Sequence, residues 1–231
     1  MEGFSYVDIF ATKGIEYIIV MVFLAGFVYF SRYLAHRAPA PETAPARPGS
    51  FVEYFRVPDG YLFHQGHAWF RREGREVVAV GLDDFAQRFL GRIDALELPH
   101  AGARVSQGEK GWSLTVDSRI VPMLSPVDGE VVAVNRDAVR NPEVVNEDPY
   151  GRGWLLKIKA TKLSANARNL LPGSVARGIL EESLRAIRLR GGEGLGIVYQ
   201  DGGVPVSGMA KALYGKEWYG AARELFLTPD E

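Results

Sequence analysis

The chain of 231 residues contains no cysteine, and its charges nearly cancel at a formal net charge of −1. The absence of cysteine excludes disulfides, thiolate metal sites and cysteine nucleophiles. The absence of a basic excess argues against general nucleic-acid binding, which requires a strongly positive face. The sequence also lacks a Gly-x-Ser-x-Gly nucleophile elbow, although serine, histidine and aspartate are all present. We therefore expect no hydrolase of that type.

One long hydrophobic run lies near the N-terminus, over residues 15–34, and reads IEYIIVMVFLAGFVYFSRYL. Its only charges, Glu16 and Arg32, stand near its two ends. Twenty helical residues span about 30 Å, the thickness of the hydrocarbon core of a bilayer. We predict a transmembrane helix over residues 15–36. The alternatives are a helix buried in a protein core and a cleaved signal peptide, because small residues follow the run at 38–40.

The two flanks of this run differ in charge. Arginines stand at its end and beyond it, at Arg32, Arg37 and Arg47, whereas residues 1–14 hold two acidic residues and a single lysine. Basic residues mark the cytoplasmic side of a membrane span. We therefore expect a single-pass protein of the inner (cytoplasmic) membrane, with the N-terminal segment 1–14 outside and the main domain in the cytoplasm.

Proline and alanine dominate the segment that follows the hydrophobic run. Residues 38–50 read APAPETAPARPGS, and we assign residues 37–50 to a linker. Proline-rich linkers are extended at about 3.1 Å per residue, so a tether of this length reaches roughly 40 Å. Such a linker holds a domain near the membrane while keeping it clear of the lipid headgroups.

Residues 51–184 read as a β-rich domain. Short β-prone runs alternate with turn signals, and Asp83 can cap a short helix that Gly91 stops. The expected elements are strands at 76–82, 92–98, 129–134 and 154–158, and a helix at 84–90. Many short strands with one small helix predict a mainly β fold, a β-sandwich or flattened barrel.

The last part of the chain, residues 185–231, is predicted to be an α-rich extension. Apolar residues at helical spacing run from 175 to 189, a hairpin is expected over 195–206, and helices are expected at 207–214 and 218–227. Large aromatic side chains in this tail either pack on the domain or dock a protein partner. The candidate docking residues are Tyr214, Trp218, Tyr219 and Phe226.

Several short motifs stand in a fixed order between residues 61 and 159. They are His67-Ala68-Trp69, Gly81 followed by Asp84 and Gln87, Leu96-Glu97-Leu98-Pro99, Ser125-Pro126-Val127, Asn141-Pro142-Glu143, Pro149-Tyr150-Gly151 and Gly153-Trp154-Leu155. In combination they resemble the H protein of the glycine cleavage system, a lipoyl-carrier domain. The resemblance implies a lipoyl-domain-like β-sandwich. Typical H proteins are soluble and end soon after their C-terminal helix, so the anchor and the tail lie outside the family pattern.

The resemblance also locates the hairpin that bears the lipoyl group in that family. The family's modified lysine lies seven residues before a Ser-Pro pair, and counting back from Ser125-Pro126 gives Ser118, as does counting nine residues forward from Glu109. Lipoate is attached through an amide to a lysine amine, which a hydroxyl cannot replace. Thr115 stands where the family has a glutamate, and Pro122 follows the tip. The resemblance thus implies a degenerate carrier tip without cofactor, made of Asp117, Ser118 and Arg119.

The sequence offers two alternatives for this tip. Lys110 is the only lysine between Gly108 and Ser125, but it lies eight residues before Ser118 and beside a turn. Asp117-Ser118 resembles the phosphopantetheine attachment pair of acyl carriers. Those carriers are helical bundles, whereas this segment is predicted to be part of a strand hairpin.

Two further patterns have a chemical and a plain interpretation. His64 and His67 stand three residues apart, but zinc needs three or four ligands and the chain offers no cysteine. Residues 192–196 read GEGLG, yet nucleotide-binding loops follow a strand and open a helix, whereas these glycines follow a predicted helix. We expect no metal site here, and a connector at 192–196.

These observations lead to one expected function and one alternative. We expect a non-enzymatic, membrane-anchored, non-lipoylated H-protein-like subunit with a structural or adaptor role in a membrane protein complex. The alternative is a working carrier or regulator in lipoate or one-carbon metabolism. The expected partners are the membrane, through one span, and the proteins of the complex.

Overall fold

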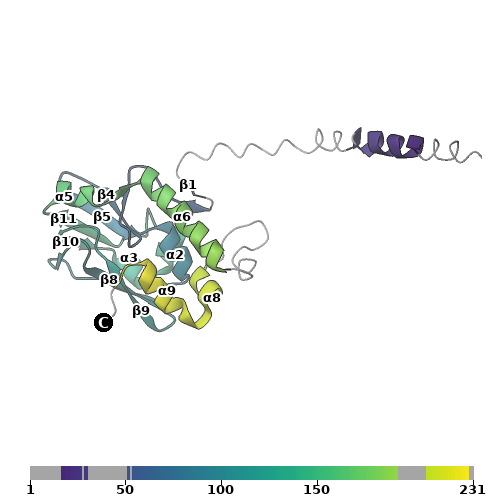
Figure 1. The fold of residues 1–231 in the computed structure, drawn as a ribbon. Coiled ribbons are helices and arrows are strands. Elements are labelled where there is room, and N and C mark those ends of the chain that lie inside the picture. Colours follow the sequence, from purple (N-terminus) through teal and green to yellow (C-terminus); the bar gives the residue numbers. More distant parts are fainter. Residues whose placement is uncertain (1–16, 28, 31–50, 53, 192–206, 229–231) are drawn as a thin grey trace, which may run out of the picture. The chain divides into compact units, whose positions relative to one another are not determined.

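The computed structural model describes residues 17–27, 29–30, 51–52, 54–191 and 207–228. The chain divides into two compact units, Met1–Pro48 and Gly49–Glu231 (Figure 1). In the first unit, residues 17–27 and 29–30 are helical. Among the described residues, no helix is both long enough and apolar enough to cross a bilayer. The rest of the predicted span, the segment 1–14, the linker 37–50 and the hairpin 195–206 lie outside the described residues.

The second unit is built on antiparallel strands in three sheets. A seven-stranded sheet has the order β12-β3-β4-β5-β11-β10-β7, a three-stranded sheet has the order β6-β8-β9, and β1 pairs with β2. The strands are β1 Phe51–Val52, β2 Phe55–Arg56, β3 Leu62–Phe63, β4 Ala68–Arg72, β5 Val77–Leu82, β6 Ala95–Glu97, β7 Arg104–Val105, β8 Lys110–Val116, β9 Arg119–Leu124, β10 Gly129–Val134, β11 Leu156–Ala160 and β12 Leu171–Pro172. The predicted mainly β fold is thereby confirmed.

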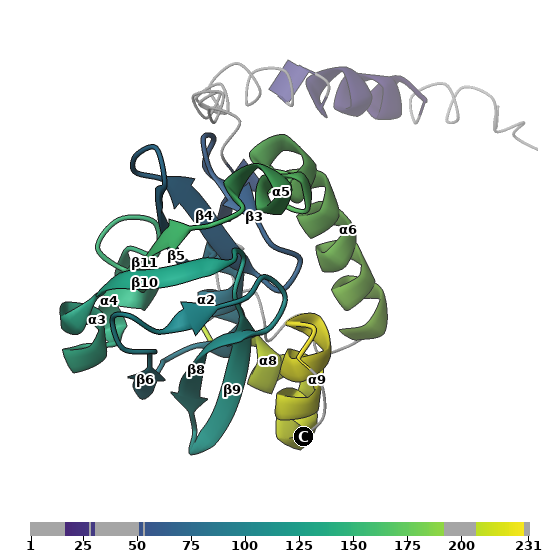
Figure 2. The ribbon, with the colours of Figure 1, turned by 90° about the vertical axis from the view of Figure 1, so that its left-hand side faces the viewer.

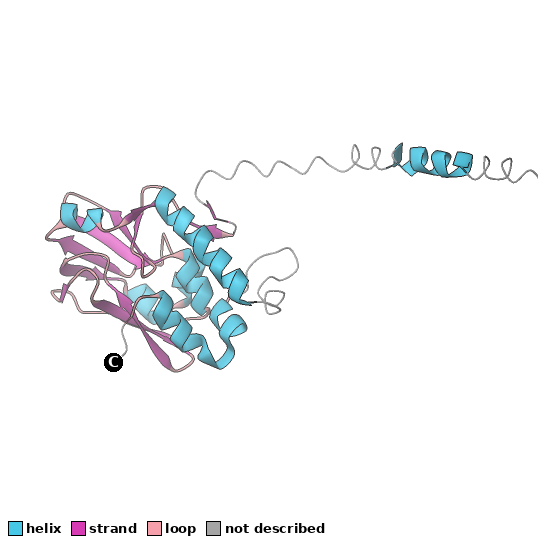
Figure 3. Cartoon of the chain, viewed as in Figure 1, coloured by secondary structure: helices cyan, strands magenta, loops and turns pink. Residues whose placement is uncertain are grey.

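Helices cover this β framework. They are α2 Asp84–Leu90, α3 Arg136–Arg140, α4 Glu143–Glu147, α5 Leu163–Arg168, α6 Gly173–Gly191, α8 Met209–Tyr214, the short 3₁₀ turn η2 Gly215–Glu217, and α9 Trp218–Leu225. Figure 3 shows α6, α8 and α9 gathered on one side of the strands, and Figure 2 shows α8 and α9 beside β9. The predicted helical tail is confirmed. Helix α6 continues across residue 184, the end of the predicted β-rich domain.

Helix α2 illustrates how local signals determine an element. The Oδ1 atom of Asp83 accepts a hydrogen bond from the backbone N–H of Ala86 at 2.7 Å, which satisfies a donor that has no partner within the helix. Gly91 ends the helix with a φ angle of 85°, a conformation that glycine adopts without steric cost. The observed bounds match the predicted helix at 84–90.

Two aromatic side chains connect the closing loop to the core. Trp69 and Tyr150 are buried, and the indole Nε1 of Trp69 donates to the carbonyl of Pro149 at 3.0 Å. Gly81 lies under the Trp69 ring, because a Cβ atom at this position would stand only 2.7 Å from ring carbons. The Tyr150 hydroxyl donates to the carbonyl of Arg56 at 2.6 Å, and burial raises the pKa of Tyr150 well above its ordinary value.

Candidate functional site

The hairpin of β8 and β9 ends in a two-residue turn. Val116 pairs with Arg119 across this turn, and its two central residues, Asp117 and Ser118, have φ angles of 48° and 61°. Positive φ at both central positions defines a type I′ turn, whose twist matches that of the flanking strands. Ser118 is exposed. The structure therefore brings the three tip residues named from the sequence together at the end of the hairpin.

One flank of the tip is held by Asp94, a residue that the sequence analysis did not single out. The backbone N–H of Asp94 donates to the carbonyl of Thr115 at 2.8 Å. Its Oδ2 atom accepts a hydrogen bond from the backbone N–H of Asp117, also at 2.8 Å. Asp94 thus satisfies one backbone donor of the turn without contacting the side chain of Ser118.

Pro122 fits the strand in which it lies. It pairs with Ser113 of β8, and β9 is the outer strand of its three-stranded sheet. Proline has no backbone N–H, so it is tolerated on such an edge strand but not in the middle of a sheet. Lys110, the alternative carrier lysine, pairs with Leu124 at the opposite end of the hairpin.

The other flank of the tip is contacted by residues 207–228, the last described part of the predicted extension, which is called the tail from here on. Lys211 of α8 forms an ion pair with the carboxylate of Asp117. The hydroxyl of Tyr219 in α9 donates to the carbonyl of Ile120 at 2.8 Å. The guanidinium of Arg119 lies 5.5 Å from the centre of the Tyr219 ring, within the range of a cation–π interaction. The tail therefore contacts three of the four residues from 117 to 120.

The tail is also anchored in the core of the body, the part of the second unit that precedes the tail. Phe226 is 0% exposed, and its ring centroid lies 6.2 Å from that of Phe89 and 5.7 Å from that of His67. The backbone N–H of Gly208 donates to the carbonyl of Arg88 at 2.8 Å. A Cβ atom on Gly91 would meet the Cα of Gly208 at 2.8 Å, so the start of the tail requires glycine at position 91.

The four candidate docking residues have different surroundings. Phe226 and Trp218 are buried within the unit, whereas Tyr214 and Tyr219 are half-buried. Lys211 lies over the Trp218 ring at 5.5 Å. Phe226 and Trp218 belong to the hydrophobic core of the described residues, which is the packing alternative that the sequence left open. They do not form an exposed surface in this fold.

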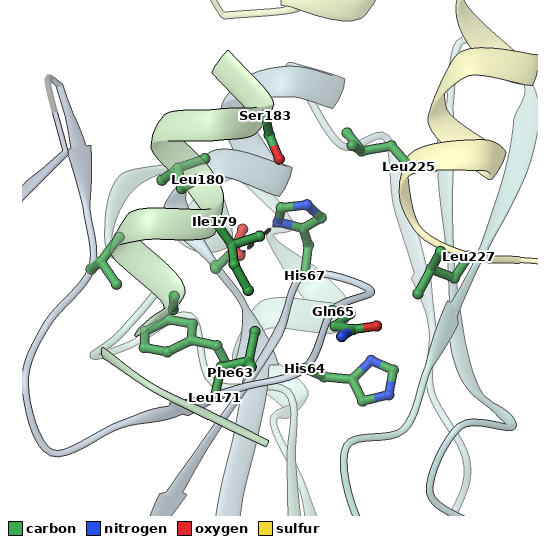
Figure 4. Close-up of a pocket in the computed structure, with 13 residues that line it drawn as sticks. Phe63, His64, Gln65, His67, Leu171, Ile179, Leu180, Ser183, Leu225 and Leu227 are labelled. Carbon is green, nitrogen blue, oxygen red and sulfur yellow. Dashed lines mark hydrogen bonds and ion pairs between the residues drawn. The ribbon is translucent and has the colours of Figure 1, made fainter. Parts of the chain in front are cut away.

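An apolar pocket of about 250 Å³ opens beside this core, between α6, the end of the tail and the turn that joins β3 to β4 (Figure 4). Its polar side chains stand on that turn, at the N-terminus of α2, where Asp83 lies, and on α6, where Ser183 lies. Leu225 and Leu227 contribute the tail wall. Figure 4 shows the Ser183 hydroxyl directed from α6 toward the imidazole of His67. The remaining lining residues include Val57, Phe63, Leu171, Ala176, Ile179 and Leu180.

The two histidines at this pocket have separate partners. His67 has a φ angle of 61°, and its Nδ1 lies 2.8 Å from Oδ2 of Asp83. Because a carboxylate only accepts hydrogen bonds, Nδ1 of His67 is the donor. Nδ1 of His64 accepts from the backbone N–H of Gly66 at 3.0 Å. Burial, together with the neighbouring His67, lowers the pKa of His64. Each ring thus uses one nitrogen within the fold.

Comparisons with known proteins agree with the fold and the motifs. The family profile described as "Glycine cleavage H-protein" matches residues 61–183. The glycine cleavage system H protein of Mycobacterium avium is 37% identical over 54% of this chain and 98% of its own length. That of Rubrobacter xylanophilus is 39% identical over 54% of this chain and 97% of its own.

Solved structures give a related result. A crystal structure of a glycine cleavage system H protein from Mycobacterium marinum covers 53% of this chain and 97% of its own length, with 28% identity and a TM-score of 0.48. The profile match ends at residue 183. The tail residues that contact the hairpin tip therefore lie outside the matched region.

Proposed function

We propose that this chain, which belongs to the glycine cleavage H-protein family, is a membrane-anchored member without a lipoyl group that acts as a structural or adaptor subunit of a membrane complex. Family membership covers the body of the chain. The loss of the carrier function, the membrane anchor and the adaptor role are the proposed elements, and each has its own supporting observation.

The observation that carries the proposal is Ser118 at the tip of the hairpin. The family's attachment chemistry needs an amine there, and the residue at the turn offers a hydroxyl. The side chains present therefore do not fit a lipoyl amide. Asp94 binds the backbone N–H of Asp117, and Lys211 pairs with its carboxylate. Both features favour a hairpin tip that takes part in protein contacts and does not bear a lipoyl group.

The mass of the intact protein tests this part directly. The full chain is produced in a host supplied with lipoate, and its mass is compared with the mass calculated from the sequence. We expect no lipoyl increment. An increment on any lysine would refute the proposal, and peptide mapping would identify the position. A genuine H protein expressed in the same host provides the positive control for lipoylation.

The membrane anchor rests on the hydrophobic run of residues 15–34 and on the basic residues that follow it. We expect the protein to stay in the membrane pellet after an alkaline carbonate wash, and removal of residues 1–37 to release it. Protease added outside intact cells should spare the body. Digestion of the body from outside would reverse the proposed orientation, and release by carbonate would contradict the anchor.

The adaptor role rests on two features. The hairpin tip is contacted by Asp94 and Lys211, and the anchor would keep the body close to membrane proteins. Extraction in a mild detergent followed by native electrophoresis tests it. We expect a species much heavier than the 25.5 kDa chain, made of several different proteins. A chain that migrates alone under several mild detergents would contradict a stable structural role.

The second candidate function is a working carrier or regulator in lipoate or one-carbon metabolism. Two observations favour it: the family match itself, and the amine of Lys211, which the tail brings to the carboxylate of Asp117 at the tip. A lipoyl group mapped to Lys211 would support this candidate. If the wild type carries no increment, the carrier form of this candidate is refuted; if it carries one, its loss in Lys211→Arg assigns it to Lys211.

A further inference from the structure

The contacts between tail and tip differ in kind from those between tail and core. The tip contacts are an ion pair between partly exposed groups, one hydrogen bond and one cation–π contact. The core contacts are the backbone bond at Gly208 and the burial of Phe226 and of four further tail side chains, Met209, Ala210, Trp218 and Ala222. Exposed ion pairs contribute little to stability and are weakened by salt, whereas a buried ring holds an element in place. The tip contacts can therefore break while Phe226 stays inserted.

The arrangement of these contacts is specific to the residues around Ser118. The tail pairs Lys211 with Asp117, and it places Tyr219 against Arg119 and the carbonyl of Ile120. Ile120 is 56% exposed, the largest exposed fraction among the large hydrophobic side chains that the structure describes in the second unit. Helix α8 lies between Gly208 and Gly215, both with positive φ, a conformation that glycine adopts without steric cost.

We infer that the tip of hairpin β8–β9 is an interaction surface that the chain's own tail occupies reversibly. The tail also defines the chemistry of the partner that can replace it. Such a partner offers a cation to the Asp117 carboxylate and a hydrogen-bond donor to the Ile120 carbonyl, and it also covers the Ile120 side chain, which the tail leaves 56% exposed. In the free chain, the tail withholds this surface from other proteins. The inference extends the proposed adaptor role by naming its docking surface.

Access to the tip can be measured because the chain has no cysteine. Ser118→Cys introduces one thiol at an exposed position. Its rate of reaction is measured with two probes, N-ethylmaleimide and a maleimide coupled to a long polyethylene glycol chain. The small probe reports exposure of the thiol itself, whereas the large probe reports the space that a protein would need. All variants are made in the full chain.

Removing the tail contacts should admit the large probe selectively. In Ser118→Cys with Lys211→Ala and Tyr219→Phe, we expect the large probe to react several-fold faster and the small probe to change less than about twofold. The matched control replaces Lys216 and Tyr214, a lysine and a tyrosine of the same tail, with Ala and Phe. Neither residue contacts the tip in the described structure. We expect this control to react like Ser118→Cys alone.

Salt and charge exchange provide independent readouts. Raising the salt from about 50 to about 500 mM shortens the screening length severalfold and should speed the large probe when Lys211 is present, but not in the doubly substituted variant. Asp117→Lys should open the tip, and adding Lys211→Asp should close it again.

The outcomes separate this inference from the proposed function. Equal large-probe rates in all variants would overturn the reversible occupation of the tip. So would a small-probe rate that rises as much as the large-probe rate, since that reports general loosening. Neither result depends on whether the wild-type chain bears a lipoyl group, which the intact mass decides separately.

Discussion

Phe226 offers the sharpest test of whether the tail belongs to the core. Its side chain is fully buried and lies against the rings of Phe89 and His67. Truncating a buried phenylalanine to alanine costs about 3–5 kcal/mol, through lost burial and the cavity left behind. We expect Phe226→Ala to lower the free energy of unfolding by that amount. For a unit of this size, the loss corresponds to a fall in Tm of roughly 6–20 °C.

The next residue supplies a matched control. Leu227 is 50% exposed, so Leu227→Ala should cost less than about 1 kcal/mol. Unfolding in urea is followed by the fluorescence of the four tryptophans, Trp69, Trp112 and Trp154 in the body and Trp218 in the tail. We expect one transition at a lower urea concentration. An early, separate loss of the Trp218 signal with an unchanged main transition would show that the tail folds independently and does not belong to the core.

The remaining predictions concern acid sensitivity, a buried polar network and the turn. Burial and the neighbouring His67 hold the pKa of His64 below its ordinary value of 6.5. The unfolded chain therefore binds a proton more readily than the folded chain does. The stability that this group contributes is present above pH 6.5 and is lost as the pH falls below that value. His64→Gln should flatten this dependence of the urea midpoint, and an unchanged slope would contradict the assignment. Asn166 is buried and donates to Asp128 at 3.0 Å, so Asn166→Ala should cost about 1–3 kcal/mol. It should also let the pKa of Asp128, which hydrogen bonds from Asn166 and Gln107 keep low, rise in an NMR titration; no rise would exclude this cause. Ser118→Gly should raise stability by about 1 kcal/mol, because glycine adopts positive φ without the clash of a Cβ atom, whereas a loss of stability would show that the serine side chain supports the turn.

Elements determined by neighbouring residues could be predicted from the sequence. Helix α2 was expected at 84–90 and observed there, because its cap and its stop lie within one short segment. Strand β10 likewise has its predicted bounds. Two-residue strands such as β3 and β12 could not be foreseen. They exist because Leu62 and Phe63 find partners in Leu171 and Pro172, more than a hundred residues away, and a single short segment contains no signal of that pairing.

The candidate site was predictable in position but not in surroundings. The distance to Ser125-Pro126 located Ser118, and the hairpin places it at the turn. The tail contacts were not visible in the sequence, because Tyr219 and Ile120 are 99 residues apart. Lys211 looks in the sequence like any solvent-facing lysine of a helix, so nothing there indicates its ion pair with Asp117. An amphipathic helix has one apolar face whether it packs on its own domain or on a partner, so periodicity alone could not decide the place of Phe226.

The geometry of the tip bears on the proposal that this hairpin bears no lipoyl group. Two non-glycine residues hold positive φ at the turn, a conformation that costs roughly 1–2 kcal/mol per residue. Such conformations persist where surrounding contacts over-determine them. Here Asp94 and Lys211 both engage Asp117, and none of these contacts uses the side chain of Ser118. A mobile cargo arm would need only the turn residue itself. Support on both flanks instead matches a hairpin whose backbone and neighbouring side chains present a surface, as the proposed docking role requires.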